Sequence, residues 1–198
     1  MGRPESGKKI LLDAALREFS ERGFKRTTLE DIATRADVSK GTLYNYFSGK
    51  EEIYQHTCDY ALTCWDDWAC SRAGEVSDPP EKLRTLAREL YYYLADHPET
   101  MKLLQRDPNL YTSLFPIFGE PVSQDGRELR TVNMLRSLLS TGIRQKVFRK
   151  MDIDKVTHIL VSLFRMFVVE SYSRPPSRSG NEMEMEILQI VVDGLLAK

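Results

Sequence analysis

Polar and aromatic side chains that could bind a nucleic acid follow one another in residues 38–47, VSKGTLYNYF. Serine and lysine can donate hydrogen bonds to phosphate, threonine and asparagine can reach base edges, and tyrosine rings can contact a thymine methyl group. Gly41 lies among them, although glycine weakens a helix. A side chain at this position would hold the backbone off the phosphates or base edges. The stretch therefore indicates a helix whose exposed face approaches a nucleic acid closely.

Two further short helices are predicted to position this one. The first has an apolar face made of Ile10, Leu11, Ala14, Ala15 and Phe19. The second begins at TTLED, where Thr27 or Thr28 can cap the free N–H groups and Glu30 or Asp31 stands where a capping box requires an acid. Its inward residues are Leu29, Ile32, Ala33 and Ala36.

Ser39 is predicted to cap the third helix, whose inward residues are Val38, Leu43 and Phe47. The residues left on its outer face are Lys40, Gly41, Thr42, Tyr44, Asn45 and Tyr46. In the alternative interpretation the tyrosines only cover the edge of the core. Several independent features would then have to coincide, so the binding interpretation is favoured.

The run TTLEDIATRADVSKGTLYNYFSGKEEIY (27–54), preceded by AALREFSERGF, resembles the N-terminal DNA-binding domain of the TetR/AcrR family of transcriptional regulators. One position departs from the family pattern: Asp37 stands at the turn where the family usually has glycine, and Asp tolerates a left-handed conformation better than most residues. By resemblance, the DNA-contact candidates are Thr28, Ser39, Lys40, Gly41, Thr42, Tyr44, Asn45, Tyr46 and Lys50. Lys50, which opens the next helix, would bind phosphate.

The periodicity of the remaining chain predicts an all-α protein of about nine helices. The first three helices are short, whereas those after Lys50 are longer and more apolar, which indicates a small head followed by a larger body. The resemblance implies that the head, residues 1–50, is a helix-turn-helix DNA-binding domain and that the body, residues 51–198, is an α-helical ligand-binding and dimerisation domain. The chain has a net charge of −1, which argues against a uniformly cationic nucleic-acid binder. The first fifty residues nevertheless hold 10 Lys and Arg against 7 Asp and Glu.

The last two predicted helices each have an apolar face too broad for one neighbouring helix. In the family this pair meets its two-fold mate in a four-helix bundle, so the resemblance implies a homodimer that matches a palindromic operator. The predicted interface consists of Ile159, Leu160, Leu163, Phe167, Leu188, Val191, Val192 and Leu195. The alternative, that both faces are buried inside one subunit, stays open because periodicity does not identify the partner.

Aromatic residues are more numerous in the middle of the chain than one core stripe requires. Tyr91, Tyr92 and Tyr93 are consecutive and cannot all face a core that Leu83, Leu86, Leu90 and Leu94 already supply. The resemblance implies a small-molecule pocket here, and the available lining suggests an apolar or aromatic effector. The candidates are Trp65, Trp68, Tyr92, Met101, Leu104, Phe118, Met134 and Phe167, although plain core packing is the commoner role for any single one.

Catalytic, cofactor and metal sites are not predicted. The chain lacks a phosphate-cradling glycine loop, a G-x-S-x-G motif and an H-E-x-x-H motif. Cys58, Cys64 and Cys70 spread over three helix faces and suit a reducing cytoplasm, and a redox sensor is the lesser alternative. The acidic pair Asp66-Asp67 is expected on a solvated helix face. No apolar run is long enough to cross a bilayer, so no membrane partner is expected.

The resemblance thus implies a cytoplasmic, ligand-responsive transcriptional repressor. It would bind double-stranded DNA at a palindromic operator as a homodimer, and a small, mainly apolar effector would release it. A ligand-independent architectural DNA binder is the alternative within DNA-binding proteins, and it would have no need of so aromatic a body.

Overall fold

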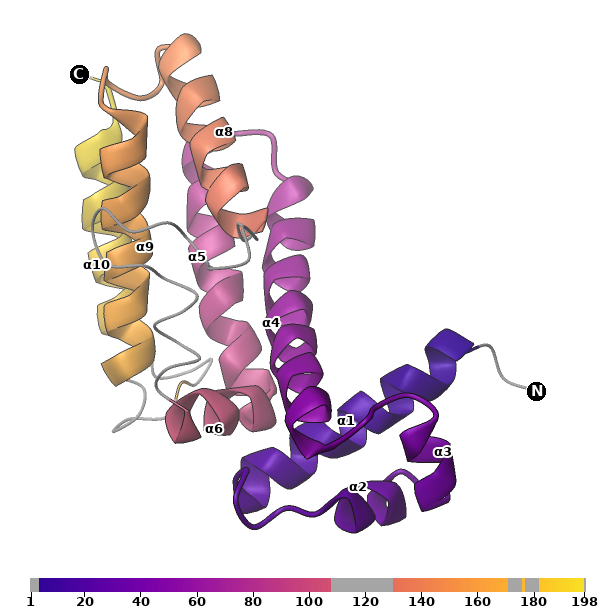
Figure 1. The fold of residues 1–198 in the computed structure, drawn as a ribbon. Helices are drawn as coiled ribbons and strands as arrows, with labels where there is room; N and C mark the ends of the chain where they lie inside the picture. The colour runs from indigo at the N-terminus through magenta and orange to yellow at the C-terminus, as the bar shows by residue number, and fades with distance from the viewer. Residues whose placement is uncertain (1–3, 108–129, 171–175, 177–181, 198) are drawn as a thin grey trace. The chain divides into compact units, whose positions relative to one another are not determined.

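The computed structural model describes residues 4–107, 130–170, 176 and 182–197. These residues contain nine helices and no named strand, which confirms the predicted all-α fold (Figure 1). Their contacts divide the chain into two compact units. Unit 1 consists of residues 1–64 and 97–110, and unit 2 of residues 65–96 and 111–198. Within the described residues, no helix is both long and apolar enough to cross a membrane.

Unit 1 is built around α1 (Pro4–Arg22), against which α2 (Leu29–Arg35) and α6 (Pro98–Arg106) both pack. The short helix α3 (Lys40–Tyr44) packs against α2, and the first part of α4 (Lys50–Gly74) completes the unit. Most of the predicted core residues are buried here, among them Leu11, Ala15, Phe19, Ile32, Ala33, Leu43 and Phe47. Leu29, Ala36 and Val38 are only partly buried and pack against this core. The short helices therefore owe their stability to one shared apolar core rather than to their length.

The prediction is wrong for Ile10, whose side chain is 51% exposed. Successive helix residues are turned by about 100°, so a residue next to a buried one can lie past the edge of the buried face. Leu11 and Leu12 are buried, and Ile10 lies beyond that edge.

The helix α6 belongs to unit 1, although the sequence placed it in the second domain. Arg106, the last residue of α6, donates from Nε to the carbonyl of Ser20 (2.7 Å) and from Nη2 to the carbonyl of Glu21 (2.8 Å). Carbonyls in the last turn of a helix lack intrahelical partners, so Arg106 satisfies the open end of α1. Gly23 then ends α1 with a left-handed φ of 77°. The functional division at residue 50 stays a prediction.

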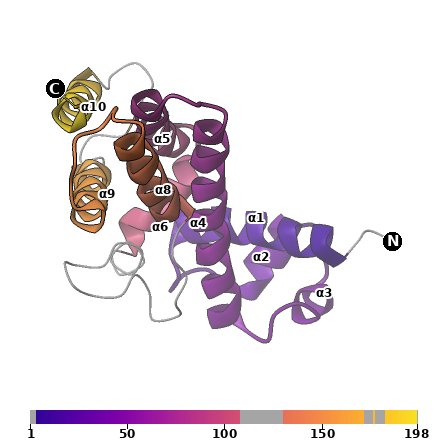
Figure 2. The same ribbon diagram turned by 90° about the horizontal axis from the view of Figure 1, so that it is seen from above.

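Unit 2 contains α5 (Pro79–Asp96), α8 (Arg130–Arg144), α9 (Ile153–Glu170), α10 (Glu182–Leu195) and the rest of α4. The helix α5 packs against α8 and α10, and α8 packs against α9. Figure 2 shows α5 and α8 between α4 on one side and α9 and α10 on the other. The predicted core stripe of α5 is confirmed, since its members are all buried: Leu83, Leu86, Leu90 and Leu94.

Asp66 is buried, not solvated as the sequence suggested, and it caps another helix. Its carboxylate accepts hydrogen bonds from the backbone N–H groups of Arg130 (2.7 Å) and Thr131 (2.9 Å), and from the hydroxyl of Thr131. The free N–H groups at the start of α8 are thus satisfied by a side chain from α4. Its neighbour Asp67 is partly exposed and pairs with the Arg130 side chain.

The turn between α8 and α9 is closed by Phe148, whose side chain is 2% exposed. The ring lies against Gly142: a Cβ at that glycine would fall 2.1 Å from Cδ2 of the ring. The N–H groups of Val147 and Phe148 both donate to the Gly142 carbonyl, at 2.9 and 3.0 Å. Only glycine leaves room for this ring against the helix backbone.

Substituting Gly142→Ala is therefore expected to lower the free energy of unfolding by about 1–3 kcal/mol, because the methyl group displaces the ring. Phe148→Ala alone is expected to cost about 3–5 kcal/mol. The double variant should lose less unfolding free energy than the two single variants lose together, because removal of the ring makes space for the methyl group. Urea unfolding of all three measures this, with Gly74→Ala as the control, since nothing lies within 4 Å of a Cβ at Gly74. Strictly additive costs would contradict the proposed clash.

Candidate nucleic-acid interface

The helix α2 begins with the predicted capping box, and Thr28 rather than Thr27 is its N-cap. The Thr28 hydroxyl accepts from the Asp31 N–H (3.1 Å), and the Asp31 carboxylate accepts from the Thr28 N–H (2.8 Å). Hydrogen bonds from Thr28 hold the pKa of Asp31 below its usual value. Thr27 is buried, and its hydroxyl donates to the carbonyls of Glu18 (3.2 Å) and Gly23 (3.0 Å).

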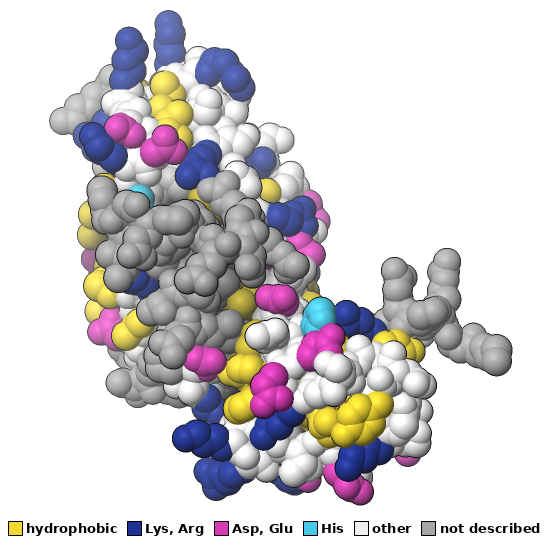
Figure 3. All heavy atoms as spheres, in the orientation of Figure 1, with side chains coloured by type: hydrophobic (Ala, Val, Ile, Leu, Met, Phe, Trp, Pro, Cys, Tyr) yellow, Lys and Arg dark blue, Asp and Glu magenta, His cyan; other side chains and the backbone are white. Residues whose placement is uncertain are grey.

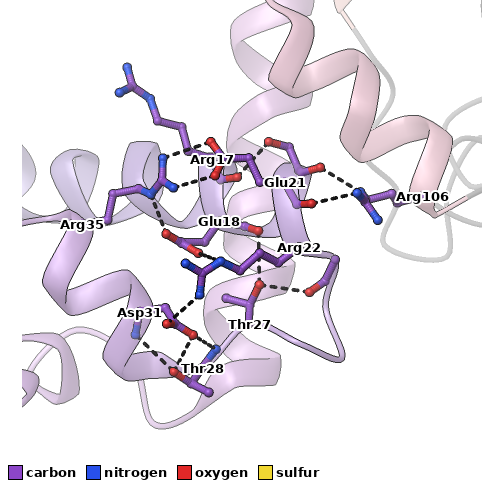
Figure 4. A network of polar contacts seen from close by, with 11 residues as sticks. Arg17, Glu18, Glu21, Arg22, Thr27, Thr28, Asp31, Arg35 and Arg106 are labelled. Carbon is purple, nitrogen blue, oxygen red and sulfur yellow. Dashed lines mark hydrogen bonds and ion pairs between the residues drawn. The ribbon is translucent and has the colours of Figure 1, made fainter.

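A network of ion pairs fixes α2 against α1 (Figure 4). Glu18 is 3% exposed and lies between two arginines: Nε of Arg35 is 2.6 Å from one carboxylate oxygen, and Nε of Arg22 is 3.1 Å from the other. Arg35 also binds both carboxylate oxygens of Glu21, at 3.1 and 2.6 Å. Arg22 reaches on to Asp31 at 2.8 Å. This arrangement sets the angle at which α2, and with it α3, is held.

Removing one arginine from this network should destabilise unit 1. In Arg35→Leu the buried Glu18 keeps only Arg22, and we expect the free energy of unfolding to fall by roughly 2–4 kcal/mol. Amide hydrogen exchange should place the lost protection in α1 and α2. The matched control is Arg17→Leu, because Arg17 is exposed on α1 and its guanidinium points away from the network in Figure 4. Equal effects of the two substitutions would contradict a structural role for Arg35.

The same substitution should change the response to acid. The hydrogen bond from Arg35 lowers the pKa of Glu21. Because this pKa is lowered, the Glu21–Arg35 ion pair contributes fully to stability above about pH 4, the usual pKa of a free glutamate. That contribution is lost as the pH falls through the lowered pKa. Arg35→Leu removes this part of the acid sensitivity, which melting temperatures between pH 3 and 7 would show.

The turn between α2 and α3 has the conformation that the sequence predicted. Asp37 has a φ of 53°, so it adopts the left-handed conformation. The N–H of Val38 donates to the Ala33 carbonyl (3.0 Å), which closes the turn. Ser39 then caps α3, because its hydroxyl accepts from the Thr42 N–H at 3.1 Å. The Thr42 hydroxyl lies 2.9 Å from the same oxygen.

The outer face of α3 carries the candidate base-contacting residues. Lys40, Gly41, Tyr44 and Asn45 are exposed, and Tyr44 is 50% exposed despite its large ring. A Cβ at Gly41 would meet only the Ser39 hydroxyl, at an ordinary 3.7 Å. The fold itself therefore does not require glycine here. Nζ of Lys40 lies 3.6 Å from a carboxylate oxygen of the exposed Glu30. An exposed ion pair of this kind is weak, so it would not keep the ammonium group from binding a phosphate.

Two of the predicted contact residues are partly used inside unit 1. Tyr46 packs against its core, and the Tyr46 hydroxyl would lie 2.5 Å from a Cβ at Gly7 of α1. Its hydroxyl therefore lies next to α1, while the side chain as a whole is half-buried. Lys50 lies with Nζ 3.3 Å from the Lys25 carbonyl and 4.5 Å from the centre of the Phe24 ring. That ammonium is held in place at the start of α4 and keeps further donors for phosphate.

Two cations that the sequence analysis did not single out lie beside these residues. Lys25 and Arg26 are exposed in the turn between α1 and α2, directly before Thr27 and Thr28. The bond from Lys50 to the Lys25 carbonyl brings this turn to the start of α4. The only sequence signal for them was the small positive excess of the first fifty residues. They extend the candidate phosphate contacts beside α3.

The predicted effector-pocket residues divide between the units. Met101 and Leu104 are buried on α6 of unit 1, the others that the structure describes belong to unit 2, and Phe118 lies outside the described residues. Trp65 is 3% exposed, and its Nε1 donates to the Leu90 carbonyl at 2.8 Å, which gives it a core role. Trp68 donates to the Glu89 carboxylate at 3.2 Å. Tyr92 and Phe167 are half-buried.

Met134 is also half-buried and lines a cleft of about 210 Å³ in unit 2. The rest of its lining is Ser77, Pro79, Lys82, Ser137, Leu138 and Thr141. No other predicted pocket residue lines this cleft, so the effector pocket stays a prediction.

The predicted interface residues differ in their exposure within a single chain. Leu160, Val192 and Leu195 are buried in unit 2, so they have a core role and are not available to a partner. Ile159 is 57% exposed, while the remaining members are half-buried: Leu163, Phe167, Leu188 and Val191. Other large apolar side chains that the sequence analysis did not choose are exposed on α9 and α10, namely Met166, Val169, Met183 and Ile190.

Cysteines and metal-binding groups add no site in the described part of the chain. Cys58 and Cys70 are buried and Cys64 is half-buried. Burial raises the pKa of the Cys58 thiol to about 12, so it is a poor nucleophile and redox sensor. No three His, Cys, Asp or Glu side chains among the described residues lie close enough together to hold a metal ion.

Comparisons with known proteins agree with this geometry. The sequence model of the family "Bacterial regulatory proteins, tetR family" matches residues 11–57, from α1 into α4. The chain is 29% identical to the repressor KstR2 of Mycobacterium tuberculosis, a ketosteroid transcriptional regulator, over 98% of this chain and 95% of that one. It is 23% identical to the HTH-type transcriptional regulator YhgD of Bacillus subtilis, over 96% and 97% of the two chains.

The fold is shared with the transcriptional regulator FadR of Bacillus subtilis, solved in complex with stearoyl-CoA. The TM-score is 0.69 at 20% identity, and the likeness covers 94% of this chain and 98% of that one. The relatives KstR2 and YhgD are named as transcriptional regulators, which agrees with the prediction that the chain is not an enzyme. The capped α2, the left-handed turn, the exposed face of α3 and the match over residues 11–57 lead to one conclusion. The chain belongs to the TetR family of transcriptional regulators.

Proposed function

We propose that the chain is a repressor that binds an inverted-repeat operator as a homodimer and is released by a small, mainly apolar effector. The observation that carries the DNA-binding part is the outer face of α3. Lys40, Gly41, Tyr44 and Asn45 are exposed there, on a helix fixed by its cap and by the ion pairs between α1 and α2. Such a face suits the major groove, where lysine and asparagine can reach base edges.

Phosphate contacts would surround this face. Thr28 stands at the start of α2, Lys50 at the start of α4, and Lys25 and Arg26 in the turn between α1 and α2. Contacts of this kind fix the position of a protein on the duplex, whereas α3 would read the sequence. Lys50→Ala should therefore weaken binding to all sequences, and Asn45→Ala should relax the preference at one base.

The homodimer is supported by the exposed apolar residues of α9 and α10. Ile159, Met166 and Val169 recur along α9, and Met183 and Ile190 along α10, each at spacings that place them on one helix face. Both helices lie at the same edge of unit 2 in Figure 2. Large exposed apolar patches mark interaction sites, and a two-fold dimer presents two copies of α3 to two mirrored half-sites.

The effector class is inferred from the relatives and from the composition of unit 2. KstR2 is a ketosteroid regulator and FadR was solved with stearoyl-CoA, so both are connected with large apolar molecules. The chain supplies half-buried aromatic side chains in unit 2, including Trp68, Tyr92 and Phe167. We therefore propose a steroid-like or long-chain acyl effector.

Selection of bound sequences from a random duplex pool tests the DNA-binding part, and an inverted repeat is the expected result.

The selected duplex then tests the effector part. Acyl thioesters and steroids are titrated against tryptophan fluorescence with and without that duplex. A true effector should lower DNA affinity about 5–150-fold, and the duplex must lower effector affinity by the same factor. A compound that binds tightly without changing DNA affinity is not the effector. A broad screen without any binder would favour the architectural alternative.

A further inference from the structure

The first turns of α1 lie beside the end of α3, and both belong to unit 1 (Figure 1 and Figure 2). Gly7 of α1 makes a close contact there. A Cβ at this residue would fall 2.5 Å from the hydroxyl oxygen of Tyr46 and 3.2 Å from Cζ of its ring. Non-bonded carbon and oxygen atoms do not come as close as 2.5 Å, so any other residue at position 7 would displace the Tyr46 hydroxyl.

Glycine is a poor residue for this place in α1 if only the helix is considered. Gly7 is the fourth residue of α1 and has a helical backbone. Glycine weakens a helix relative to alanine, because it loses more conformational freedom on folding. The helix therefore gains nothing from Gly7. What the glycine supplies is the space that the Tyr46 phenol occupies.

The Tyr46 side chain is held in this space from several directions. It is half-buried and packs against the core of unit 1, and its N–H donates to the Leu43 carbonyl at 3.0 Å. The next residue, Phe47, is 1% exposed, and Nζ of Lys8 lies 5.6 Å from the centre of its ring. A helix of five residues has little stability of its own. Contacts with α1 thus support the end of α3, as the Ser39 cap supports its start.

The Tyr46 hydroxyl has a donor available for a partner outside the chain. It makes no hydrogen bond to any residue that the structure describes, and it is not fully buried, so water reaches it. Lys8 makes no ion pair within the described ranges, so its charge adds to the attraction of an anion. Figure 3 shows basic side chains beside hydrophobic ones, which include tyrosine, over the part of unit 1 where α3 lies in Figure 1. A hydroxyl in such surroundings is a suitable donor to a phosphate oxygen.

We propose that Gly7 is a positioning residue for DNA binding. The space that it leaves lets the Tyr46 phenol lie over α1, where the hydroxyl donates to a phosphate of the bound duplex. This inference rests on the proposed DNA binding by α3 and adds to it a residue that acts through Tyr46. Phosphate contacts fix the position of a protein on the duplex and carry no sequence information. Displacement of this hydroxyl should therefore weaken binding to all sequences alike.

The test is Gly7→Ala in the full chain, measured on the selected operator and on a random-sequence duplex. The methyl group pushes the hydroxyl away, and both affinities should fall about 10-fold, the usual effect of one hydrogen bond to a charged group. Alanine is the better helix former, which offsets the cost of the clash, so the melting temperature should change little. A purely structural role of Gly7 would instead lower the melting temperature.

The decisive comparison repeats Gly7→Ala in a chain that carries Tyr46→Phe. Phenylalanine lacks the hydroxyl, so Tyr46→Phe alone should lose about 10-fold on both duplexes. Its nearest remaining ring atom would be Cζ at 3.2 Å from the added methyl group, which a small shift of the ring relieves. Gly7→Ala should then cause no further loss, whereas independent effects would multiply to about 100-fold. Gly74→Ala is the control, because nothing lies within 4 Å of a Cβ there, and it should leave both affinities unchanged.

Unchanged DNA affinity of a folded Gly7→Ala chain would overturn the proposal. A full further loss in the Tyr46→Phe chain would do the same, since Gly7 would then not act through the hydroxyl. A loss confined to the selected operator would assign the hydroxyl to a base and not to a phosphate. Tyr46→Phe that binds both duplexes like the unaltered chain would refute the contact whatever the stability of Gly7→Ala. Failure of the proposed function shows separately, because the unaltered chain would then select no duplex at all.

Discussion

A chain that carries both Ile159→Asp and Ile190→Asp is expected to sediment as a monomer at concentrations where the unaltered chain is a dimer. The two side chains are 57% and 65% exposed in a single chain, so the substitutions disturb little of its own core. In the proposed dimer each carboxylate would be buried without a partner, at a cost of several kcal/mol. A total loss of about 4 kcal/mol weakens association roughly 1,000-fold.

Analytical ultracentrifugation and thermal melting together decide this prediction. The double variant should keep the helical content and unfolding behaviour of an intact subunit. The matched control, Asn133→Asp with Ser140→Asp, adds the same charge to exposed polar positions of α8 and should leave the dimer intact. A double variant that remains folded and dimeric would place the interface away from the apolar faces of α9 and α10. Loss of operator binding should accompany dissociation, because each half-site would then be bound alone.

Local signals in the sequence predicted the parts of the fold that local physics decides. The capping box at Thr28 and Asp31 depends on residues three apart, and the cap at Ser39 likewise. The left-handed Asp37 follows from the steric demand of a tight turn. The apolar periodicity of α1 and α5 predicted their buried faces, apart from Ile10 at the edge of one. These features could be predicted because few residues, close in the chain, determine each of them.

Contacts between distant residues could not be predicted in the same way. Asp66 caps a helix 64 residues further along the chain, and Arg106 caps one 86 residues before it. A single acidic or basic residue on a helix carries no mark of such a partner. The sequence places Tyr46 on the outer face, because the periodicity of so short a helix does not show that its hydroxyl lies next to Gly7 of α1.

The dimer face shows a different limit of periodicity. A broad apolar face shows how much surface a helix must bury but not which neighbour buries it. On α10 the sequence could not distinguish Val192, which is buried within the chain, from Ile190, which is exposed. Only the packing of α10 against α5 separates them. For this reason the test of the dimer uses Ile190 and not Leu195, whose replacement would damage the core.

The second large effect is expected at Gly41, where valine should lower affinity for the selected operator by roughly 2–6 kcal/mol in a dimer that uses two copies of α3. The added side chain would stand between the helix backbone and the DNA, so that neighbouring base contacts by Lys40 and Asn45 lengthen. The fold should tolerate the change, because a Cβ at this position meets only the Ser39 hydroxyl at 3.7 Å. Valine is also a better helix former than glycine, so the melting temperature should not fall.

Three chains measured side by side separate a DNA effect from a folding effect. Gly41→Ala should lose less affinity than Gly41→Val, because the methyl group is smaller. Gly74→Val is the matched control at an exposed helical glycine of unit 2, where nothing lies within 4 Å of a Cβ, and it should bind the operator like the unaltered chain. Affinity is measured by fluorescence anisotropy and stability by thermal melting. If Gly41→Val bound the operator as tightly as Gly74→Val does, α3 would not approach DNA by its glycine face. The recognition surface would then have to be sought among Lys25, Arg26 and the start of α2.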